Sequence, residues 1–178
     1  MTITEALAEI KTINARVVKR LESIGPYVLR DSRILDPLSK DGGSAAFIAS
    51  ELQAVRDLTI RSISLRTAIQ KANLEKTISV NGESRTVAEW LTWRREHSET
   101  QKSFTNMLIR NIASARDKFK EKVGIVDLQN KPVGATIGEL IVNLDEKWLL
   151  GESDRLEKTL GDLDGQLSLF NARTEVEI

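Results

Sequence analysis

The hydrophobic pattern of the first 24 residues predicts one long α-helix. Positions recur at alternating steps of four and three, as in a coiled-coil seam with one polar insertion: Ile3, Leu7, Ile10, Asn14, Val17, Leu21 and Ile24. Thr2 and Glu5 have the spacing of a capping box at its start, and Gly25-Pro26 predicts its end. Asn14 either lies buried in the seam, where it fixes the register, or lies at the edge while Ile13 fills the gap.

Residues 25–43 form a linker that is longer than most connections between helices. Besides two prolines and Gly42-Gly43, it contains apolar residues able to pack along a neighbour: Tyr27, Val28, Leu29, Ile34, Leu35 and Leu38. Two roles fit this composition. The linker is either an arm that reaches another subunit or a strap over its own helices.

The rest of the chain predicts five further elements and a tail. Apolar stripes at helical spacing, alternating runs and turn residues set their bounds. In order they are a helix over 44–73, a β-hairpin over 77–86, a helix over 87–122, a strand and turn over 123–144, a helix over 145–171 and a tail strand over 174–178. The fold class we expect is mainly α, with long antiparallel helical hairpins or a bundle, a small β-hairpin and short edge strands.

Local signals specify the hairpin and its surroundings. Asn81-Gly82 is typical of a type I′ turn, which needs two residues with positive φ. Thr86 and Glu89 form a second capping box. No Gly or Pro interrupts the helix that follows, so we expect it to be nearly continuous across its polar stretch rather than broken there. The tail alternates as an edge strand does, and we expect it to add to the hairpin, in its own subunit or in a neighbour's.

Composition favours a single helical domain over residues 1–178. Of the 178 residues, 29% are charged and only 4% are aromatic, which suits long helices better than an enzyme with a lined pocket. The chain has no cysteine, so disulfides and thiolate metal sites are excluded. It has neither an apolar run of about 18 residues nor a signal-peptide pattern, and we expect a protein made in the cytoplasm with no membrane partner.

The net charge of zero hides an uneven distribution. Residues 51–126 hold fourteen basic and nine acidic groups, a net charge of +5, whereas residues 127–178 hold five basic and eleven acidic groups, a net charge of −6. The two segments either neutralise each other within one fold or meet across a subunit boundary, where complementary fields set the register.

The sequence indicates no catalytic residue, no cofactor and no metal site. The single histidine, His97, lies in a very polar stretch, where a solvated side chain is expected. Motifs for phosphate, dinucleotide, zinc-protease and nucleophile-elbow sites are absent. Basic residues 56, 61, 66 and 71 are spaced by five, which turns a helix by about 500°. They therefore spiral round the helix, which argues against a nucleic-acid partner.

Seven residues are candidate contacts with a partner protein. Two tryptophans one turn apart share a helical face, which would form a hot spot if it were exposed. The linker and the tail supply the other five. The candidates are Trp90, Trp93, Tyr27, Leu29, Leu35, Val176 and Ile178.

Two stretches resemble a family of small helical bacterial proteins, uncharacterised or labelled septicolysin. They are Ile69-x-x-Ala72-Asn73-x-x-x-Thr77 continuing through Gly82 and Arg85-Thr86-x-x-Glu89-x-Leu91-x-x-Arg94, and the C-terminal Leu167-x-x-Phe170-Asn171-x-x-Thr174-Glu175. Phe170 and Ala172 depart from the family's aromatic position after the asparagine. The resemblance covers about half of the chain, and implies an antiparallel helical hairpin and oligomerisation but no activity.

Residues 86–96 also resemble proteins encoded among tailed-phage structural genes. Together with the apolar seams and the linker, this favours a non-catalytic structural or assembly protein that binds copies of itself, and a capsid-associated or cementing role in a virion, with a major capsid protein as a further partner. Such a protein is cytoplasmic when made and part of the virion afterwards. The alternatives are a stand-alone cytoplasmic homo-oligomer and a helical-bundle enzyme or ligand binder.

Overall fold

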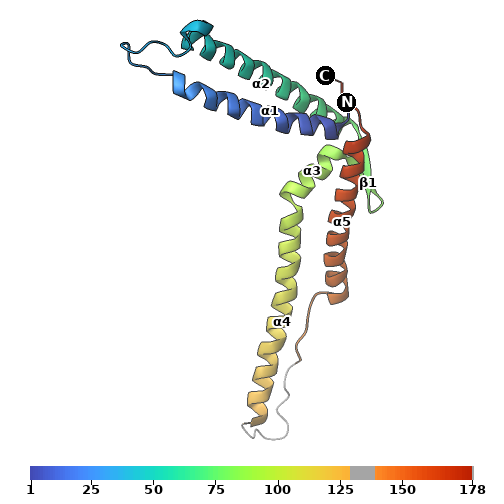
Figure 1. The fold of residues 1–178 in the computed structure, drawn as a ribbon. Helices are drawn as coiled ribbons and strands as arrows, with labels where there is room; N and C mark the ends of the chain where they lie inside the picture. Colours follow the sequence, from blue (N-terminus) through green and yellow to red (C-terminus); the bar gives the residue numbers. More distant parts are fainter. Residues whose placement is uncertain (129–138, 178) are drawn as a thin grey trace. The chain divides into compact units, whose positions relative to one another are not determined.

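The computed structural model describes residues 1–128 and 139–177. Its main elements are α1 (Ile3–Ile24), α2 (Ser44–Glu75), β1 (Thr77–Val80), β2 (Glu83–Thr86), α3 (Val87–Glu96), α4 (Ser98–Leu128) and α5 (Glu146–Arg173) (Figure 1). The mainly α fold with a small antiparallel β-hairpin is therefore confirmed. The chain divides into two compact units, Met1–Ile78 with Leu167–Ile178 (unit one) and Ser79–Gln166 (unit two). Each is described by itself, and the single domain over 1–178 stays a prediction.

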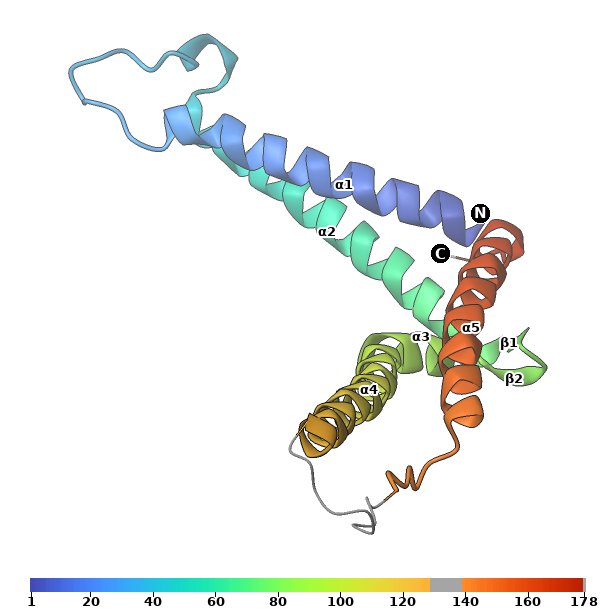
Figure 2. The same cartoon turned by 90° about the horizontal axis from the view of Figure 1, so that it is seen from below.

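Unit one is built on an antiparallel hairpin of α1 and α2. The two helices lie side by side, with the loop between them at one end and the N-terminus at the other (Figures 1 and 2). Its buried core consists of Ile3, Ala6, Ile10, Ile13, Leu65, Ala72 and Val176. Ion pairs from Arg20 to Glu51 (2.8 Å) and from Arg61 to Glu9 (2.9 Å) join the helices beside this core. Burial of the apolar seam, flanked by these pairs, sets the register of the hairpin.

The buried face of α1 is shifted from the predicted seam. Ile13 is buried, whereas Asn14 is exposed, so the second of the two arrangements left open by the sequence is the one that forms. Leu7 and Leu21, which also belong to the predicted seam, are 46% and 48% exposed. The reason is that Ala6 and Ile13 continue the three-four spacing of Ile3 and Ile10, and an apolar residue at position 13 avoids burying an amide.

The C-terminal tail pairs with the N-terminus rather than with the hairpin. The amide of Ile3 donates to the carbonyl of Thr174 (3.0 Å), and the amide of Val176 donates to the carbonyl of Met1 (2.8 Å). These bonds flank an antiparallel bridge between Thr2 and Glu175. The expected addition to residues 77–86 is thus replaced by pairing within unit one, because this position lets Val176 enter the core.

The β-hairpin of unit two has the predicted turn. Asn81 and Gly82 have φ values of 52° and 81°, as a type I′ turn requires. The capping box of Thr86 and Glu89 forms at the start of α3. The two capping boxes and the hairpin are therefore confirmed as the sequence predicted them.

The helix expected over 87–122 consists instead of α3 and α4, which meet at His97. His97 has φ −118° and ψ −33°. The Ser98 hydroxyl, which is buried, donates to the carbonyl of Arg94 (2.6 Å). The interruption forms without Gly or Pro, and the Ser98 bond gives the Arg94 carbonyl, in the last turn of α3, a hydrogen-bond partner.

The structure describes only part of the segment 123–144, where a strand and a turn were expected. Residues 123–128 belong to α4 rather than to a strand, and residues 129–138 lie outside the described residues. Residues 139–145 form no strand. The last helix, expected over 145–171, is confirmed as α5, whose buried seam includes Leu149, Leu156, Leu163 and Leu167 at the predicted positions.

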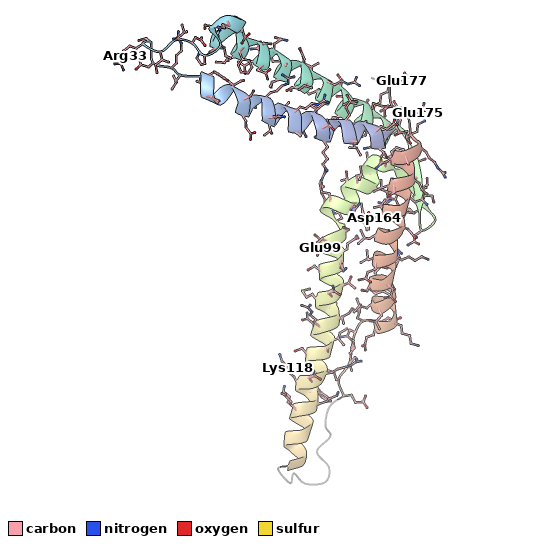
Figure 3. All side chains as sticks on the ribbon, viewed as in Figure 1. Arg33, Glu99, Lys118, Asp164, Glu175 and Glu177 are labelled. Atoms are coloured by element: carbon pink, nitrogen blue, oxygen red, sulfur yellow. The ribbon has the colours of Figure 1, made fainter. Side chains whose placement is uncertain are left out.

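The basic middle and the acidic end of the chain are joined by ion pairs inside unit two. Arg94 pairs with Asp164 (2.6 Å), Lys102 pairs with Glu157 (3.3 Å), and Arg116 pairs with Glu146. Each pair links α3 or α4 to α5, and Figure 3 labels Asp164 on α5. The first of the two charge arrangements considered above, neutralisation within one chain, therefore accounts for these groups. Among the described residues, no helix is both long and apolar enough to cross a membrane.

The position of the α1 core face predicts opposite effects for two neighbouring substitutions. Ile13→Ala should lower the free energy of unfolding by about 2 to 5 kcal/mol, because it leaves a cavity in the core. Asn14→Ala should raise it by about 0.5 kcal/mol or leave it unchanged, because alanine favours a helix and no buried bond is lost. Urea unfolding followed by circular dichroism measures both, and a larger loss for Asn14→Ala would contradict this register.

The pairing of the tail predicts that its removal destabilises unit one. Truncation after Arg173 removes Val176 from the core and should lower both the melting temperature and the helical signal. Truncation after Val176 keeps the core residue and both backbone bonds, and serves as the control. Loss of assembly without any loss of stability in the shorter variant would show instead that the tail acts on a partner.

Candidate interaction site

The two tryptophans expected to contact a partner pack on each other in unit two. The Trp90 and Trp93 rings meet edge to face, with centroids 5.7 Å apart, and the Arg85 guanidinium lies 4.9 Å from the centroid of the Trp90 ring. Trp90 is 2% exposed and Trp93 is half-buried. The indole N–H of Trp93 donates to the amide oxygen of Gln101 (3.1 Å). Trp90 is thus a core residue of its own unit rather than an exposed contact.

A pocket of about 660 Å³ opens beside this pair within unit two. The hairpin, the tryptophans and the first half of α5 line it. The Asn81 amide donates to the Thr159 hydroxyl (2.8 Å), which donates to the carbonyl of Arg155 (2.7 Å). Acidic and basic side chains occur in equal number on its wall: Glu83, Glu152, Asp154, Arg85, Arg155 and Lys158. Because the charges balance, the pocket favours neither an anionic nor a cationic ligand. Among the described residues, no cluster of His, Cys, Asp and Glu could hold a metal.

The linker presents the most exposed apolar side chains of unit one. Leu29 and Leu35 are 87% and 81% exposed, and Val28 and Ile34 are 59% and 61% exposed. Residues 28–35 are called the apolar loop below. The Arg30 guanidinium donates to the carbonyl of Ile34 (2.8 Å) and so closes the loop on itself. Arg33 lies at its outer end (Figure 3). Tyr27, another of the predicted contacts, packs edge to face on Phe47 with ring centroids 5.2 Å apart.

Asp36 ties the end of the apolar loop to the start of α2. Its carboxylate accepts hydrogen bonds from the Ser44 amide (2.9 Å), the Ser44 hydroxyl (2.6 Å) and the Leu38 amide (2.9 Å). The Ser44 hydroxyl bond, followed by the two amide bonds, lowers the pKa of Asp36. Gly43, at the N-cap position with φ +91°, has no side chain to cap the helix. Asp36 takes over that role from seven residues upstream, next to the positive end of the helix dipole.

These contacts bear on whether the linker is an arm that reaches another subunit or a strap over its own helices. The linker returns to its own α2 and is fastened near both ends, by Tyr27 on Phe47 and by Asp36 on Ser44. The side chains of Val28, Leu29, Ile34 and Leu35 nevertheless remain exposed instead of covering the helices. The loop therefore presents apolar groups from a segment that is anchored at both ends.

An apolar groove of about 590 Å³ in unit two was missed by sequence reasoning. It runs along α4 and the segment that precedes α5, and its apolar wall includes Phe104, Leu108, Ile112, Leu140, Ile141 and Trp148. The spacing of four along α4 signals one helix face, but only the fold brings Ile141 and Trp148 to it. Of the remaining predicted contacts, Val176 is buried in the core of unit one, and Ile178 lies outside the described residues.

Comparisons with family models, with curated proteins and with solved structures give no match. The candidate sites therefore stand on their own geometry and chemistry.

The cap supplied by Asp36 predicts a pH-dependent contribution to stability. Since the pKa of Asp36 is lower in the fold than its usual 3.8, its contribution is present above that value and is lost as the pH falls through the folded pKa. Asp36→Asn should lower the melting temperature at neutral pH, and the difference from the parent should shrink in acid. Asp41→Asn is the matched control in the same loop, and an equal effect of both substitutions would contradict the capping role.

Proposed function

We propose that this protein is a non-catalytic assembly protein that forms oligomers. The observation that carries the proposal is the apolar loop, in which Leu29 and Leu35 stay more than four-fifths exposed. Clustered exposed apolar groups are costly for a protein that acts alone in water, and they mark contacts with other proteins.

The anchoring of the loop supports its use as a contact. Because Asp36 and Tyr27 already hold the chain, little conformational freedom is lost when a partner covers Leu29 and Leu35. The neighbouring Arg30 and Arg33 add directional groups at the rim, as interfaces commonly have. The loop thus combines apolar anchors with a polar surround.

The lowered pKa values of five carboxylates have structural causes. The lowered pKa values of Glu9, Asp31 and Glu96 come mainly from side-chain hydrogen bonds to a surface arginine. Those of Asp36 and Glu89 come from bonds that cap helices. Each shift has a structural cause, so none of these carboxylates has the perturbation that burial near a reacting group produces.

The setting we propose is a tailed-phage particle, in which the protein serves as a capsid-associated or cementing subunit, with a capsid protein as its further partner. This part rests on the resemblance of residues 86–96 to phage structural proteins. The competing proposal is a stand-alone cytoplasmic homo-oligomer. Binding of the purified protein to capsids of the phage that encodes it would separate the two.

The proposal predicts that Leu29→Ser with Leu35→Ser weakens assembly without unfolding the protein. The mass of the parent, measured by light scattering, should rise over an about hundredfold range of concentration. The mass of the double variant should rise less, because two apolar anchors are lost.

Leu150→Ser with Leu169→Ser is the matched control, because these leucines are also exposed, at 55% and 47%, but lie on α5. Its mass curve should follow that of the parent. A parent that stays monomeric at every concentration, with or without capsids, would sink the proposed function.

A further inference from the structure

Helix α2 carries a second stripe on the side away from its core. The stripe consists of Leu52, Arg56, Thr59, Ile63, Thr67, Gln70 and Leu74, all exposed, and is called the outer stripe. Its steps of four and three place it along one face of the helix. The buried Leu65 lies two residues, or about 200°, from Ile63. Leu52, Ile63 and Leu74 are 39%, 59% and 66% exposed, so α2 carries uncovered apolar side chains on the side opposite its core.

The outer stripe is chemically symmetric about Ile63. Threonines lie four residues to either side, at positions 59 and 67, and leucines lie eleven residues to either side, at positions 52 and 74. The positions seven residues away are polar on both sides, Arg56 and Gln70. A two-fold axis through Ile63 therefore places like residue types on one another, which is the property of a surface that binds its own copy.

We propose that a second copy of this chain packs on the outer stripe, antiparallel, with the two-fold axis through Ile63. The inference rests on the proposed function and adds to the apolar loop a second contact surface with a stated partner. In this arrangement Ile63 meets Ile63 and each Leu52 meets the Leu74 of the other copy. The contact runs over 23 residues of helix, from Leu52 to Leu74, which span about 33 Å.

The charges favour the antiparallel direction over a parallel one. A parallel pair in register would set Arg56 against Arg56, and two like charges at close range repel. The antiparallel pair sets Arg56 against Gln70, whose amide oxygen accepts a hydrogen bond from a guanidinium. Charge and symmetry therefore select the same partner and the same direction.

The threonines of the outer stripe fit a tightly packed seam. The Thr59 hydroxyl donates to the carbonyl of Val55 within its own helix (2.8 Å). Its proton is thus satisfied before any partner binds, and burying Thr59 adds no unpaired donor. Thr59 and Thr67 are also small enough to leave space beside the larger Ile63, as alternating large and small residues do in interlocked helices.

Disulfide cross-linking tests the geometry directly, because the chain has no cysteine of its own. Ile63→Cys should form a covalent dimer in high yield, since the two residues meet at the axis. Leu52→Cys and Leu74→Cys should each fail alone, because their copies lie about 33 Å apart and a disulfide needs Cα atoms within about 7 Å. A mixture of the two should form the heterodimer. Val18→Cys, an exposed position on α1 (54%), is the control and should give only background.

A second variant tests the contact without cross-linking. Ile63→Arg puts two like charges on the axis and should raise the dissociation constant of the dimer about tenfold or more, whereas Val18→Arg should leave it unchanged. Helicity measured by circular dichroism shows whether each variant is folded. Light scattering then gives the dissociation constants.

The outcomes separate this inference from the function on which it rests. Self-cross-linking by Leu52→Cys, or an oligomer that is indifferent to Ile63→Arg and gives no Ile63→Cys dimer, would overturn the outer stripe as the contact while assembly stands. A monomeric parent that gives no cross-link would overturn both. Cross-linking by Ile63→Cys and by the mixed pair, together with weakening by Ile63→Arg, is the result we expect.

Discussion

Leu65 has no exposed surface, although unit one consists mainly of two long helices, a loop and the end of the chain. It belongs to one buried cluster that joins α2 to the start of α1, through Ile3, and to the tail that pairs with it, through Val176. A two-helix hairpin buries little by itself, so this added strand-like segment is what completes the core.

The same hairpin explains why its surfaces suit assembly. Two helices hide only the faces that meet, and α2 retains an outer stripe with Leu52, Ile63 and Leu74 that a larger bundle would cover. At the other end of the hairpin, the Asp36 cap and the Tyr27–Phe47 contact hold the apolar loop in place. The small core and the large exposed apolar area thus both follow from the two-helix architecture.

Unit two is organised by different forces. Its hairpin, the edge-to-face tryptophans and Arg85 over Trp90 form one packed cluster, and ion pairs such as Arg94–Asp164 join its helices. Exposed ion pairs contribute little stability each, so their main consequence is to match basic side chains of α3 and α4 with acidic side chains of α5. At these positions, basic groups from the middle of the sequence pair with acidic groups from its end within one chain. The proposed assembly is therefore based on apolar contact.

Local chemistry in the sequence determined the helix starts at Thr2 and Thr86, the turn at Asn81-Gly82 and the stripe of α5, because caps, positive φ and helical spacing act over a few residues. The tertiary structure alone decided the rest. It placed Ile13 rather than Asn14 in the core, moved the tail from the hairpin to Met1–Ile3, buried Trp90, and brought Asp36 to Ser44. Each of these outcomes depends on which distant segment of the chain packs against the residue. The spacing of residues along the chain does not specify that neighbour.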